Sequence, residues 1–105
     1  MPILFYDHLT NKDEIHYHIE TLHSNKEHQT KLKELVNEVI HQEIINYIIG
    51  KLKSFHHQLF LDKLHATPYD PDILIFLREN IHPEIEEQIT SHFQTIIIKI
   101  KKDLS

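Results

Sequence analysis

The pattern of apolar and polar positions is clearest between residues 32 and 52, which read LKELVNEVIHQEIINYIIGKL. In the second half of this stretch, isoleucines point in several directions around a helix axis, as in a buried helix. We therefore predict a helix over about 25–49 whose first half lies on a surface and whose second half crosses the core. In the first half, apolar residues recur at the spacing of one helix face: Leu32, Leu35, Val36, Val39 and Ile40.

Both ends of this helix carry recognisable signals. Ser24 and Glu27 have the spacing of a capping box, in which each side chain reaches the other residue's backbone amide. Gly50, the only glycine in the sequence, predicts a C-terminal stop, because glycine adopts the left-handed conformation without a Cβ clash.

A second long helix is predicted over about 83–104. Pro83 opens it, glutamates fill its first turn, and lysines lie near its end, in agreement with the helix dipole. Shorter helices are predicted over about 11–23, 54–65 and 73–80. The predicted fold class is all-α, a compact bundle of four to five helices in one domain spanning 1–105. The apolar stripe of the helix predicted over about 83–104 is long and unbroken: Ile85, Ile89, Phe93, Ile96, Ile97, Ile100 and Leu104.

Composition narrows the classes of function. The formal net charge is −5, so we expect no nucleic-acid partner. The absence of cysteine removes thiol chemistry and cysteine metal sites, and one glycine cannot form a phosphate-binding loop. No stretch has the length of a membrane span or the form of a signal peptide, so we expect a cytoplasmic protein.

Eleven histidines are scattered along the chain. Because free histidine titrates near pH 6.5, they allow a pH response. A solvated helical surface that happens to be rich in histidine explains the same content.

An acidic residue precedes a histidine by three positions five times, as in the Glu-x-x-His motif of carboxylate-bridged di-iron bundles. Two of these pairs form the candidate metal set: Glu20, His23, Glu38 and His41. We expect Glu38 and His41 to face water, which weakens the metal interpretation. Exposed helix neighbours of opposite charge explain the same spacing. No catalytic residue is predicted, and we expect no cofactor unless this set binds a transition metal such as iron or zinc.

Two parts of the sequence resemble short, uncharacterised, all-helical proteins of uncultured bacteria. They are residues 4–9 (LFYDHL), and residues 65–71 (HATPYDP) followed by 74–77 (LIFL). The resemblance implies a helical fold and carries no catalytic residue.

The leading hypothesis is a non-enzymatic helical protein–protein interaction module that forms a homodimer, because so short a chain has few layers to cover its apolar surface. The all-round apolar half of the central helix and the stripe of the last helix motivate it. The alternative is a histidine–carboxylate metal-binding bundle, di-iron-like or zinc. The expected dimer interface consists of Ile45, Ile48, Ile49 and Ile97.

Overall fold

A computed structural model describes residues 4–104, and within them it contains five α-helices, one short 3-10 helix and no strand. The predicted all-α class is confirmed, and so are the two long helices, α2 and α5. The elements in chain order are η1 (Asp7–Leu9), α1 (Asp13–Leu22), α2 (Lys26–Lys51), α3 (Ser54–Ala66), α4 (Asp72–Asn80) and α5 (Ile85–Leu104).

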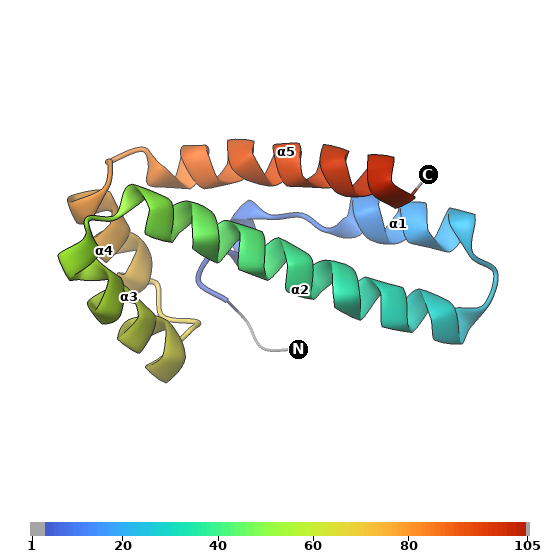
Figure 1. Ribbon diagram of the computed structural model, residues 1–105, viewed down its shortest axis with the longest axis horizontal. Helices are drawn as coiled ribbons and strands as arrows, with labels where there is room; N and C mark the ends of the chain where they lie inside the picture. The colour runs from blue at the N-terminus through green and yellow to red at the C-terminus, as the bar shows by residue number, and fades with distance from the viewer. Residues whose placement is uncertain (1–3, 105) are drawn as a thin grey trace.

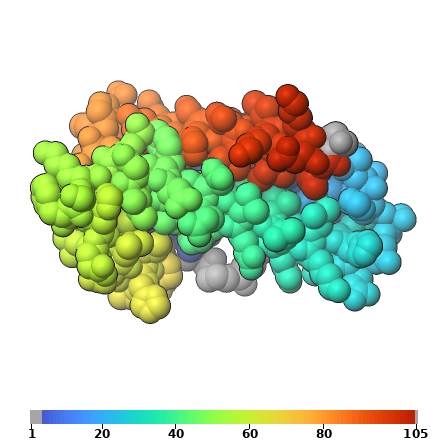
Figure 2. Space-filling view, in the orientation of Figure 1, coloured from blue at the N-terminus to red at the C-terminus, as the bar shows by residue number. Residues whose placement is uncertain are grey.

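The two long helices set the shape of the molecule (Figure 1). They run in opposite directions along an elongated body of 46 × 24 × 21 Å, and α1 packs against both of them at one end. At the other end, α4 packs on α5 and α3 packs on α4. In the space-filling view, α2 lies along one face of the body below α5 (Figure 2).

Aliphatic side chains dominate the core. The second half of α2 contributes Ile44, Ile45 and Ile48, all buried, and this confirms that it crosses the interior. The apolar stripe of α5 is buried over most of its length and faces α2, α1 and α4. This single cluster accounts for the stability of the elongated body, because burial of apolar surface is the main favourable term in folding.

The two predicted ends of α2 are wrong in detail. Asn25, not Ser24, is the N-cap, and its side-chain oxygen accepts hydrogen bonds from the amides of Glu27 and His28 at 2.9 and 3.2 Å. Gly50 does not adopt a left-handed conformation: it lies inside the helix, and no described residue has a positive φ. Instead, the extended backbone of Leu52 ends the helix.

The first half of α2 buries only part of the apolar face predicted from the sequence. Val36 and Ile40 are buried, but Leu35 and Val39 are 56% and 41% exposed. The neighbouring helices approach from one side only, where polar residues make the contacts to α1. There, His16 Nε2 and Asn37 Oδ1 are 3.0 Å apart.

The segment before η1 is inserted between α2 and the α3–α4 pair. The Phe5 ring makes an edge-on contact with Phe60, the one fully buried side chain of α3, at a centroid distance of 6.2 Å. The Phe5 amide donates to the carbonyl of Pro68, in the loop between α3 and α4, at 2.8 Å. Residues 4–6, called the N-terminal segment below, therefore hold the α3–α4 pair in place.

Candidate functional site

The four predicted metal-binding residues make separate contacts. Glu20 pairs with Lys33, and the His23 ring lies edge-on to His28 at a centroid distance of 6.5 Å. Glu38 is exposed on α2. Within residues 4–104, no group of three or more His, Asp or Glu side chains could hold a metal ion. The structure therefore does not bring these four residues together, and metal binding remains a prediction from the sequence alone.

Glu20 has a well-defined ionic partner. The ammonium nitrogen of Lys33 lies 2.6 Å from Glu20 Oε1. This hydrogen bond and the lysine charge lower the pKa of Glu20, against a small opposing effect of burial. The carboxylate is thus ionised and engaged in linking α1 to α2.

His41 is partly buried, contrary to the expectation that it faces water. Its Nδ1 lies 2.5 Å from the hydroxyl oxygen of Tyr6, and the two rings stack at a centroid distance of 5.9 Å. Burial lowers the pKa of His41, and the positive charge of Lys12 adds to this effect while Asp7 opposes it. The neutral imidazole is therefore favoured, and its Nδ1 accepts the hydrogen bond.

Tyr6 is fully buried, and within residues 4–104 its hydroxyl has no partner besides His41, so its hydrogen is satisfied only when Nδ1 accepts it. Burial raises the pKa of the Tyr6 phenol, and the negative charge of Asp7 raises it further. A phenol that stays protonated is a reliable donor. Because Nδ1 accepts, the proton of neutral His41 lies on Nε2, which leaves one N–H available to other partners.

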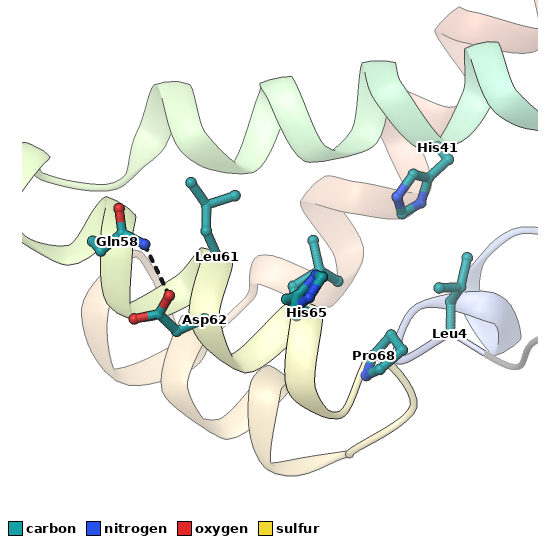
Figure 3. A pocket seen from close by; sticks show the side chains of 8 residues that line it. Leu4, His41, Gln58, Leu61, Asp62, His65 and Pro68 are labelled. Atoms are coloured by element: carbon teal, nitrogen blue, oxygen red, sulfur yellow. Dashed lines mark hydrogen bonds between the residues drawn. The ribbon is translucent and has the colours of Figure 1, made fainter.

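A cleft of about 600 Å³ lies beside His41, between α2 and α3 (Figure 3). Figure 3 shows His41 projecting from α2 toward the end of the cleft where His65 and Pro68 lie. Asp62, on α3, accepts a hydrogen bond from Gln58 at 2.8 Å. The cleft mixes apolar and polar groups: it is lined by Leu4, His41, Gln58, Leu61, Asp62, Leu64, His65 and Pro68.

The cleft offers few reactive groups. It contains two imidazoles and one carboxylate, and the described residues that line it include no hydroxyl or amine nucleophile. The Tyr6–His41 pair fixes the tautomer of one imidazole, which suits hydrogen bonding to a polar group more than covalent chemistry.

The residues predicted for a dimer interface lie in or against the core of a single chain. Ile45, Ile48 and Ile97 are buried, and Ile49 is partly buried and packs against the same cluster. They fill the space between α2 and its neighbours. In this conformation, a dimer interface would have to be formed by residues other than these four isoleucines, because they are already packed inside one chain.

Part of the apolar pattern in the first half of α2 faces outward. Leu35 and Val39 are exposed, whereas Leu32 beside them is half-buried and packs against the core. These three residues are called the α2 apolar face below. Leu32 and Leu35 also line a shallow hollow of about 280 Å³. Its remaining lining residues are His23, His28 and Lys31.

Two of these features could not be located from sequence periodicity. The Tyr6–His41 pair joins residues 35 positions apart, and the Glu-x-x-His spacing that singled out His41 does not point to Tyr6. The α2 apolar face has a helical spacing in the sequence, but the same spacing describes a buried stripe.

No family model, curated protein or solved structure matches the chain. Among the helices of residues 4–104, none combines the length and hydrophobicity needed to cross a bilayer. Function has to be inferred from the geometry of this chain.

Proposed function

We propose that the chain is a non-enzymatic interaction module that pairs with a second copy of itself through the α2 apolar face. The observation that carries this proposal is the exposure of Leu35 and Val39, one helical turn apart on the same side of α2. Figure 1 shows α5 ending short of the connection between α1 and α2, so α5 does not cover the first turns of α2. Clustered exposed apolar residues often mark interaction surfaces.

Charge complementarity favours a second copy as the partner. Lys31 and Glu38 lie on the same flank of the α2 apolar face, one on each side of Leu35 along the helix. When two copies of α2 pack antiparallel about a two-fold axis near Leu35, Lys31 of each copy approaches Glu38 of the other. A two-fold interface of this kind is self-complementary by construction.

The size of the α2 apolar face determines how tightly we expect the dimer to associate. Three aliphatic residues and one ion pair per copy form a small interface, which fits a weak, reversible dimer. Among residues 4–104, the ion pair of Lys31 is a solvent-exposed contact with Glu27 at 3.6 Å, which leaves its ammonium group accessible to a partner. The metal-binding alternative has no comparable supporting arrangement within the described residues.

Sedimentation equilibrium over about three orders of magnitude in concentration tests the proposal. We expect a reversible monomer–dimer equilibrium that Leu35→Lys shifts toward monomer. Ile98→Lys is the matched control, because Ile98 is 67% exposed on α5, away from the α2 apolar face. An unchanged monomer at every concentration, or equal effects of the two substitutions, contradicts the proposal.

A charge exchange tests the antiparallel arrangement separately. Lys31→Glu alone and Glu38→Lys alone place like charges opposite each other in the dimer, so each should weaken association. The double variant restores opposite charges and should recover it. Failure of the double variant to recover association would overturn the arrangement.

A further inference from the structure

We propose that the Tyr6–His41 hydrogen bond is an acid-released latch that joins the N-terminal segment to α2 and limits the width of the adjacent cleft. The inference stands on different residues from the proposed dimer face. It starts from the position of Tyr6 and His41 where three parts of the fold meet: α2, the N-terminal segment and the α3–α4 pair.

The bond requires an unprotonated imidazole. When His41 takes up a proton, both ring nitrogens become donors and neither can accept from the Tyr6 hydroxyl. The bond could reverse only if the phenol hydrogen found a new acceptor. Tyr6 is fully buried, and within residues 4–104 its hydroxyl has no partner besides His41. Protonation therefore leaves a buried donor unsatisfied, which is costly.

The charged groups around His41 set its response. Asp7 approaches from η1 and Lys12 from the start of α1, and they act in opposite directions on the imidazolium. From α3, Asp62 and His65 line the same cleft. The Asp62 carboxylate accepts a hydrogen bond from Gln58. Burial and Lys12 therefore oppose the protonation of His41, and Asp7 favours it.

The consequence of release follows from what the N-terminal segment contacts. Phe5 is attached to the α3–α4 pair through Phe60 and the carbonyl of Pro68. Tyr6 provides the polar link from the same segment to α2. The following η1 stays packed on α5, and Thr90 Oγ1 lies 3.5 Å from the carbonyl of Leu9. Loss of the latch therefore loosens residues 4–6 as a whole, including the hydrogen bond from the Phe5 amide to Pro68. The α3–α4 pair is then held less firmly, and the cleft widens.

Amide hydrogen exchange followed by NMR tests the latch, because the Phe5 amide reports directly on the segment. After correction for the intrinsic effect of pH, we expect its protection to fall about tenfold between about pH 7.5 and about pH 5. The fall should share its midpoint with the titration of the His41 ring signal. A protection factor that stays constant across this range overturns the latch.

Matched variants separate His41 from the other histidines. His41→Asn places a non-titrating oxygen near the position of Nδ1, so protection should stay high at both pH values. His65→Asn removes the other imidazole of the cleft and should retain the wild-type response. If His41→Asn responds to pH as the wild type does, the latch is excluded.

Tyr6→Phe keeps the test decisive if His41→Asn does not fold. This variant lacks the bond at every pH, so its Phe5 protection should be low and independent of pH. It should match that of the wild type near pH 5. A Tyr6→Phe chain with wild-type protection at neutral pH would overturn the proposal.

Discussion

Lys33 of α2 and Glu20 of α1 form an ion pair with a nitrogen–oxygen distance of 2.6 Å, across the contact between the two helices. The pair lies on the same side of α2 as Asn37 and His41, at intervals of one helical turn. All three α2 residues meet polar partners that precede α2 in the chain: Glu20, His16 and Tyr6. A row of polar contacts therefore aligns α2 with the N-terminal part of the molecule, beside the apolar core that both share.

The Glu20–Lys33 pair should contribute little to stability, because both side chains are partly exposed to solvent. We expect Glu20→Gln to leave the thermal midpoint nearly unchanged at neutral pH. The pair lowers the pKa of Glu20, so its contribution is present above the usual carboxyl value of 4.5 and is lost as the pH falls further. Calorimetry at neutral and acid pH measures both effects. A large loss at neutral pH would contradict this assignment.

Tyr6 should make the fold sensitive to alkali. Because burial raises its pKa, the folded chain keeps the phenol protonated, whereas the unfolded chain ionises it near 10.0. The free energy of unfolding should therefore fall as the pH rises above about 10. Tyr6→Phe should reduce this dependence, at a cost of about 1–2 kcal/mol at neutral pH. Urea titrations across this range provide the measurement. Tyr17→Phe, at an exposed position, should behave like the wild type.

Phe60 should be the most sensitive position of α3. Its ring is fully buried against Phe5, so Phe60→Ala should cost about 3–5 kcal/mol. Phe55 belongs to the same helix and is 72% exposed, so Phe55→Ala should cost less than about 0.5 kcal/mol. Urea unfolding followed by circular dichroism measures both values. Similar losses for the two variants would mean that the packing of α3 differs from the one described.

The N-cap of α2 offers a comparison between adjacent residues. Asn25 accepts two backbone hydrogen bonds, so Asn25→Ala should destabilise the chain by about 1 kcal/mol. Ser24→Ala should have almost no effect, because Ser24 lies outside the cap. The difference in thermal midpoint between the two variants is the quantity to compare. A larger loss for Ser24→Ala would restore the capping box predicted from the sequence.

Gly50 should tolerate a side chain. It lies in the last turn of α2 without a positive φ, and a Cβ atom there would meet nothing within 4 Å. Alanine favours the helix by up to about 1 kcal/mol relative to glycine. We therefore expect Gly50→Ala to raise the free energy of unfolding. Destabilisation by this substitution would indicate that Gly50 needs a conformation that alanine cannot adopt.

Local patterns were sufficient to predict the helices. The all-α class and the approximate extents of α2 and α5 follow from helical periodicity and from the placement of charges near helix ends, which depend on nearby residues only. The N-cap was misplaced by one residue because Ser24 and Asn25 are both good caps. The register of the first turn decides between them, and sequence does not fix it.

Contacts between distant residues explain what could not be predicted. Leu35 and Val36 are neighbours with similar side chains, but α1 and α5 approach α2 on the side of Val36 alone. The environment of His41 depends in the same way on Tyr6, which arrives from a segment 35 positions earlier. A helical pattern defines a face, but only the neighbouring elements decide whether that face is buried.

Because the N-terminal segment is inserted between α2 and the α3–α4 pair, it can dock only after α3 and α4 have been synthesised. Phe5 leaves the ribosome early, yet its partners Phe60 and Pro68 are made more than fifty residues later. The segment cannot reach its place until the α3–α4 pair has emerged, because contacts this distant in sequence form late. Nascent chains stalled before Phe60 emerges should therefore leave Tyr6 open to protease, whereas chains stalled after the whole of α5 has emerged should protect it.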